Sequence, residues 1–112
     1  MARYLISFPD GAMAHIPDED MPAVGEAAHA VLFEAKAAGV WIHGGGILHD
    51  VETTVVTPDG TVSDAPRTGP PVGGFSIVDV PTREEALHWA AKTAVACRCT
   101  QEVRELLPDP DA

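Results

Sequence analysis

Residues 73–91 read GGFSIVDVPTREEALHWAA, a strand followed directly by a helix. We expect the strand over residues 74–80. Thr82 and Glu85 then form a capping box, with Thr82 as the N-cap and Glu85 at the third helical position. The apolar stripe expected on this helix consists of Leu87, Ala90, Ala91, Ala94 and Val95.

The same order of strand and helix opens the chain. Residues 3–8 alternate, with Tyr4, Ile6 and Phe8 on one side, which indicates a half-buried strand. A helix is expected next, with Asp18 or Asp20 as N-cap and Gly39 as its C-terminal stop. Its apolar positions recur at helical spacing and are Val24, Ala27, Ala28, Val31, Leu32, Ala35 and Ala38.

The remaining segments complete the pattern. Residues 40–48 and 98–106 read as strands, and residues 52–63 as a hairpin with an Asp59-Gly60 turn. The order β-α-β, hairpin, β-α-β predicts an α+β, ferredoxin-like fold, with an antiparallel sheet and both helices on one face. We expect one domain over residues 1–107 and a frayed tail over 108–112.

This topology leaves the other face of the sheet uncovered. A face bearing Leu, Trp and Val side chains would be an exposed apolar patch, which soluble proteins usually cover. No further segment of the chain is long enough to do so. We therefore expect a second copy to cover it in a twofold homodimer.

Composition narrows the classes of partner. Lys and Arg number 7 against 17 Asp and Glu, a formal net charge of −10. This balance argues against nucleic acid and against an anionic membrane surface, both of which require a basic face. The N-terminal residues lack the pattern of a signal peptide, so a cytoplasmic location is expected, with the two cysteines reduced.

One family resemblance rests on residues 73–80 and 82–91, quoted above. Further support comes from Ala38-Gly39-Val40 before a Gly-rich strand, the Asp59-Gly60 turn and residues 102–104, Glu-Val-Arg. The chain resembles the YCII-related family, in the branch named for an Asp-Gly-Pro-Phe motif. The resemblance implies a dimeric α+β barrel, in which two ferredoxin-like sheets close face to face.

The chain departs from the family at two places. The motif position reads Asp64-Ala65-Pro66-Arg67, which retains only its first and third residues. Other YCII-like proteins are thought to pair a His on the first helix with an Asp, but Ala28 occupies that position here. The catalytic dyad is therefore not transferred to this chain.

Candidate site residues come from the strand over 40–48. Alternation puts Val40 and Ile42 under the helices, so Trp41 and His43 are expected to face the dimer cavity. His43 would be a general base or a ligand contact, and Trp41 an apolar wall. A histidine that only contacts the partner subunit is the alternative. His43 and His49 together make an incomplete metal site, so no metal is expected, and a metal-dependent enzyme that uses both is a third possibility. No other cofactor is expected.

Charged residues complete the candidate site. Asp64 keeps the first position of the family motif, and Arg3, Arg67 and Arg104 are cations able to receive an anionic group. Ordinary surface ion pairs are the alternative for each arginine. The sequence thus predicts a homodimer that binds a small metabolite at the sheet face, with acid-base or lyase chemistry at His43 if it is an enzyme. A non-catalytic dimerisation or accessory module is the alternative function.

Overall fold

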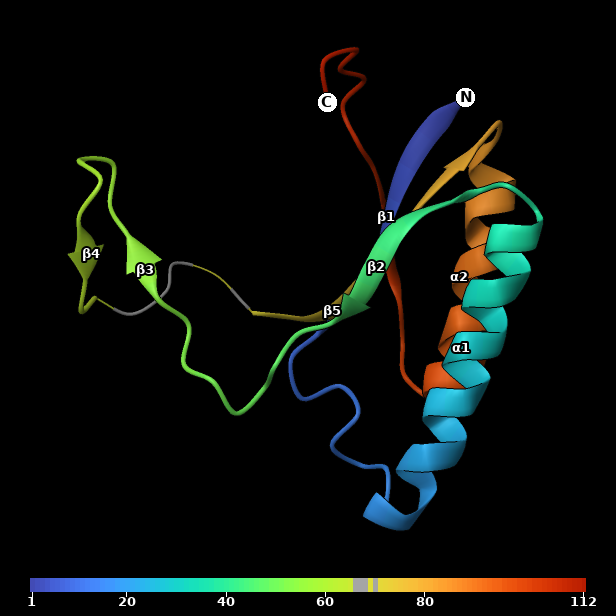
Figure 1. Cartoon of the computed structure of the whole chain (residues 1–112), viewed down its shortest axis with the longest axis horizontal. Helices are drawn as coiled ribbons and strands as arrows, with labels where there is room; N and C mark the ends of the chain where they lie inside the picture. The colour runs from blue at the N-terminus through green and yellow to red at the C-terminus, as the bar shows by residue number, and fades with distance from the viewer. Residues whose placement is uncertain (66–68, 70) are drawn as a thin grey trace.

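The computed structural model describes residues 1–65, 69 and 71–112. Figure 1 shows two helices against one sheet, with a separate two-stranded arm. In chain order the elements are β1 (Ala2–Pro9), a 3-10 turn (Asp18–Asp20), α1 (Met21–Ala37), β2 (Trp41–Gly46), β3 (Val55–Val56), β4 (Val62–Ser63), β5 (Val72–Val80), α2 (Arg83–Cys97) and β6 (Glu102–Glu105).

The main sheet has four strands in the order β2-β5-β1-β6, and every neighbouring pair is antiparallel. The two β-α-β units interleave, because β5 lies between β1 and β2 while β1 lies between β5 and β6. Both helices cover the same face of the sheet (Figure 1). The expected α+β architecture is confirmed, and the strand order is compatible with a ferredoxin-like fold.

The core lies between this face and the helices. Alternation along β1 and β5 turns Tyr4, Ile6, Val78 and Val80 toward the helices, where each is at most 5% exposed. Burying each aliphatic side chain of this kind stabilises the fold by about 1.5–3 kcal/mol. The rest of the buried cluster comes from the helices and the residue before β2, namely Ala35, Val40, Ala86, Trp89 and Ala90.

The start of α2 and the end of α1 follow the expected signals, whereas Asp20, at the N-cap position of α1, makes no side-chain capping hydrogen bond. The Thr82 hydroxyl accepts a hydrogen bond from the Glu85 backbone N–H at 3.2 Å, which confirms Thr82 as the N-cap of α2. Gly39, with φ of 75°, follows the end of α1 in the left-handed conformation that favours glycine. An Arg98–Asp20 ion pair at 2.8 Å links the end of α2 to the start of α1.

The expected apolar stripe of α2 was wrong in part. Leu87 is 40% exposed and Val95 81% exposed, whereas Trp89 and Cys97 are buried. Successive residues turn by about 100° around a helix, so Leu87 and Trp89 lie about 200° apart and cannot face the same way. The larger aromatic side chain takes the core position, since it removes more apolar surface from water.

The arm formed by β3 and β4 extends away from the main sheet (Figure 1). Gly60 adopts a φ of 86° in its turn, and the Asp59 carboxylate accepts hydrogen bonds from Thr57 and Thr61. These bonds lower the pKa of Asp59 to about 2, because they favour the charged form. The chain as a whole is more extended than a compact domain, since its radius of gyration is 15.6 Å against about 13 Å for a compact chain of roughly 100 residues.

Candidate functional site

The uncovered face of the sheet holds three of the candidate residues singled out above, namely His43, Arg3 and Arg104. Residues that alternate with the buried ones on β1 and β5 point away from the helices, so Leu5 and Ile77 form the apolar centre of this face. Phe75 joins them, two residues before Ile77 on β5. All three side chains are partly exposed. We call this surface the open sheet face.

His43 lies on the open sheet face. It pairs with Ile77 across β2 and β5, and its ring centroid is 6.2 Å from that of Phe75, at an angle of 60°. The imidazole is exposed, so it is accessible to a ligand or a partner surface.

Arg3 and Arg104 lie on the same face from two other strands. Arg104 pairs with Leu5, and Arg3 lies two residues before Leu5 on β1, which makes the arginines diagonal neighbours. Arg3 Nε is 3.8 Å from Asp79 Oδ2, so its charge is partly balanced within the chain. The face therefore presents two cations beside an apolar centre.

Asp79 is the residue of this face that sequence analysis missed. Its side chain is partly buried, and Oδ1 is buried without a hydrogen-bond partner among the described residues. A signal was present in the sequence, because Asp is depleted inside strands and this one stands between Val78 and Val80. Buried polar atoms are normally hydrogen-bonded, so this unsatisfied oxygen marks Asp79 as an unusual residue of the sheet.

Trp41 does not belong to this face, and its expected orientation was wrong. The pairing of β2 with β5 shifts between Trp41 and His43, because Ile42 is an extra residue in a β-bulge. The bulge lets Trp41 pair with Val78 and pack against the core, while His43 points to the opposite side. Ile42, expected under the helices, is 40% exposed.

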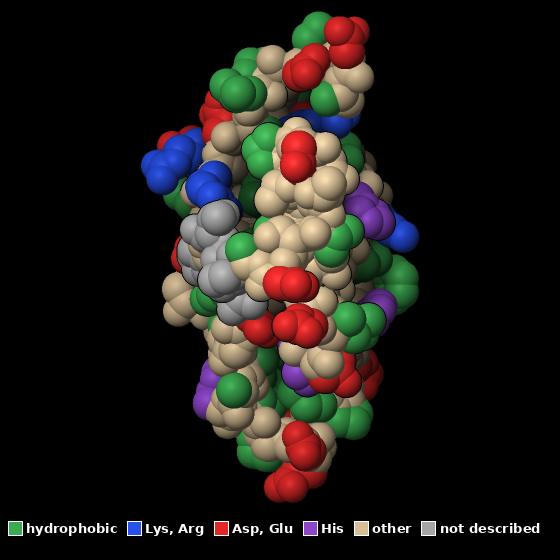
Figure 2. All heavy atoms as spheres, turned by 90° about the vertical axis from the view of Figure 1, so that its left-hand side faces the viewer, with side chains coloured by type: hydrophobic (Ala, Val, Ile, Leu, Met, Phe, Trp, Pro, Cys, Tyr) green, Lys and Arg blue, Asp and Glu red, His purple; other side chains and the backbone are tan. Residues whose placement is uncertain are grey.

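The motif residues are not brought to the open sheet face. Asp64 follows β4 directly and is exposed on the arm. Figure 2 views the molecule from the side of the arm, where acidic and hydrophobic side chains are scattered over the surface. Arg67 lies outside the described residues.

The described residues give no support to metal binding at His43 or His49. In residues 1–65, 69 and 71–112, no three His, Cys, Asp or Glu side chains are grouped to hold a metal ion.

In the same part of the chain, neither helix is long and apolar enough to cross a bilayer.

Comparison with protein-family models gives no match, and comparison with curated proteins gives none either.

Proposed function

We propose that the chain acts as a homodimer whose two open sheet faces close on each other and bind a small metabolite between them. The observation that carries this proposal is the combination of an uncovered apolar centre at Leu5, Phe75 and Ile77 with His43 and two arginines around it. A partner that covers such an apolar surface stabilises it, and polar groups around an apolar centre favour a ligand site.

Charge supports a second copy as the partner. The chain has a net charge of −10, so most pairings of its surfaces would bring acidic side chains together. On the open sheet face the charges instead balance, with Arg3 and Arg104 against Asp79 and Glu102. Two such faces related by a twofold axis would meet without net repulsion.

Size supports the same arrangement. Four strands about 4.8 Å apart, averaging roughly seven residues, give a projected face of about 450 Å². Two apposed faces would then approach the ~1,000 Å² expected of a specific interface, before any contribution from the arms. The resemblance to YCII-related proteins, whose sheets pair face to face, supports a dimeric α+β barrel on separate grounds.

The chemistry proposed for the site follows from its side chains. Arg3 and Arg104 would hold a carboxylate or another anionic group by charge-assisted hydrogen bonds. The His43 imidazole would accept a proton from the bound substrate and return it at another atom, which is acid-base catalysis without a cofactor. Asp79 would hold Arg3 in place on this face through the 3.8 Å ion pair between its Oδ2 atom and Arg3 Nε.

A non-catalytic dimerisation module is the second candidate. The observation that favours it is the position of Asp64, which lies on the arm rather than beside His43. In that case the dimer interface would be filled by side chains and leave no space for a ligand. A structure of the dimer distinguishes the two functions, since only the first requires an open cavity around His43.

The homodimer itself is tested by measuring molar mass in solution by light scattering. Wild type should be a dimer, and Ile77→Glu should be a monomer, because it buries a charge at the centre of the apolar face. Val95→Glu is the matched control, since Val95 is 81% exposed on α2, and it should remain a dimer. If Ile77→Glu fails to fold, chemical cross-linking of the wild-type protein still tests whether the dimer forms. A monomeric wild type at about 100 µM would sink the proposal, because it would mean a dimerisation free energy weaker than about −5.5 kcal/mol.

A further inference from the structure

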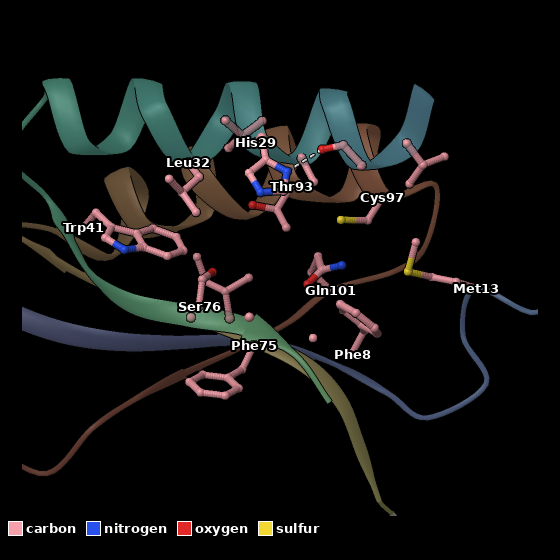
Figure 3. A pocket seen from close by; sticks show the side chains of 18 of the residues that line it. Phe8, Met13, His29, Leu32, Trp41, Phe75, Ser76, Thr93, Cys97 and Gln101 are labelled. Atoms are coloured by element: carbon pink, nitrogen blue, oxygen red, sulfur yellow. Dashed lines mark hydrogen bonds between the residues drawn. The ribbon is translucent and has the colours of Figure 1, made fainter. Parts of the chain in front are cut away.

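A cavity of about 420 Å³ lies on the other side of the sheet, between α1, the end of α2 and strands β1 and β2. Figure 3 shows Trp41 at one end of it and Phe8 at the other, with Leu32 above from α1. Part of its lining, including His29 and Gly46, is exposed, so the cavity opens to solvent. A partly open, mainly apolar cavity of this size is typical of ligand pockets.

The cavity exists because small residues face each other across it. Gly25 and Ala28 are small residues among those that line it from α1, and Gly44 and Gly46 line it from β2. A Cβ atom at Gly25 or Gly46 would meet no other atom within 4 Å, so larger side chains would fit there. At Gly25 and Gly46 the opening is thus set by the size of the side chain, whereas at Gly44 the backbone of β5 is too close to admit a larger residue.

Several neutral polar groups point into this apolar space. Ser76 is 9% exposed, and it lines the cavity from β5. His29 Nδ1 lies 2.8 Å from the Gly25 carbonyl oxygen, so in the tautomer that donates this bond Nε2 is free to accept another. Thr93 and Gln101 also line the cavity (Figure 3).

The lining carries no fixed charge. Within the described part of the chain, no Lys, Arg, Asp or Glu contributes to it. Burial, and secondarily the nearby Cys99, raises the pKa of the Cys97 thiol, which keeps this lining group neutral. A buried carboxylate or ammonium group of a ligand would therefore lack an ion-pair partner, which is strongly unfavourable.

We propose that this cavity is a binding site for an uncharged, mostly apolar small molecule that carries a hydroxyl or carbonyl group. The volume suits a fused-ring aromatic compound, since about 150 Å³ already holds benzene and ligand pockets range from about 300 to 1,000 Å³. Trp41 and Phe8 provide aromatic walls, and Ser76 with His29 offers a donor and an acceptor for the polar group. The site is separate from the open sheet face, so either proposal can fail without the other.

The test uses 1-naphthol as a neutral probe and 1-naphthoate as its charged counterpart, titrated into the full chain and followed by NMR. Naphthol should give saturable shifts and intermolecular NOEs to Phe8, Leu32 and Trp41. Naphthoate should bind more weakly by at least about tenfold, because its carboxylate finds no cation in the cavity. Equal binding of the two probes would overturn the assignment of ligand class.

A matched pair of variants tests the location. Ala28→Leu places a larger side chain in the empty space and should weaken naphthol binding by at least about tenfold, with the fold retained. Ala37→Leu, on an exposed position of the same helix, should leave binding unchanged. Wild-type NOEs to Leu5 and Ile77 instead, or no saturable binding at all, would overturn the proposal even if Ala28→Leu failed to fold.

Discussion

Gly44 tests the packing of β2 against the centre of the sheet. A Cβ atom added there would lie 2.5 Å from the Phe75 carbonyl oxygen, 2.7 Å from the Ser76 Cα atom and 2.9 Å from the Trp41 ring. Two of these atoms belong to the backbone of β5, which is held between β1 and β2. Gly44→Ala therefore forces β2 to move away from β5, and the indole to shift as well.

The expected cost of Gly44→Ala is about 3 kcal/mol, at the upper end of the range for overpacked substitutions, because backbone cannot yield as a side chain does. For a domain of this size such a loss lowers the melting temperature by about 10–20 °C. Gly46→Ala is the control on the same strand and the same face. Its Cβ atom would meet nothing within 4 Å, so we expect no loss, and a gain of up to about 1 kcal/mol from the restricted unfolded chain.

The assay is urea unfolding followed by far-UV circular dichroism, at one fixed protein concentration because a dimer makes stability concentration-dependent. The difference between the two alanine variants is the informative quantity. Equal stability of Gly44→Ala and Gly46→Ala would refute the close approach of β2 and β5 at Gly44. It would also contradict the shifted register of β2 and β5 that turns Trp41 toward the helices.

Three further predictions concern single side chains. Trp41→Ala should lower the free energy of unfolding by about 3 kcal/mol and Ile42→Ala by less than about 1 kcal/mol in urea titrations. A larger loss for Ile42→Ala would show that Ile42, and not Trp41, packs under the helices. The Asp59 carboxyl should titrate at about 2 by NMR, against an ordinary value of 3.8. Because its folded pKa is lowered, its stabilisation of the turn is present above the ordinary value and is lost as pH falls through about 2; an ordinary midpoint would show that the turn hydrogen bonds are not formed. His43→Ala should keep the dimer but abolish turnover once a substrate is identified, and full turnover would exclude His43 as the proton carrier.

Local patterns predicted the elements of the fold with good accuracy. Alternation over residues 3–8 identified β1, and Thr82 and Gly39 were assigned correctly as helix signals, because capping and left-handed backbone depend on neighbours in sequence. The hairpin turn at Asp59-Gly60 was found for the same reason. Each of these features is determined within a few residues.

The orientation of side chains was less predictable where pairing between distant segments sets it. The bulge at Ile42 exists only because β2 pairs with β5 in a shifted register, and it reverses the expected direction of Trp41. In α2, alanines occupy several faces of the helix, so the pattern could not show that Trp89 would displace Leu87 from the core. Asp79 carried a signal, a charged residue within a strand, that was not used.

The sequence by itself determined the order of strands and helices, the class of fold and the acidic charge, since these follow from local periodicity and composition. Only the tertiary structure decided which face each β2 residue occupies, which groups accompany His43, and that a cavity of about 420 Å³ separates α1 from the sheet. The physical reason is that cavities and shared faces depend on the volumes of side chains from separate elements. The sequence of any one segment does not show how the side-chain volumes of several elements combine.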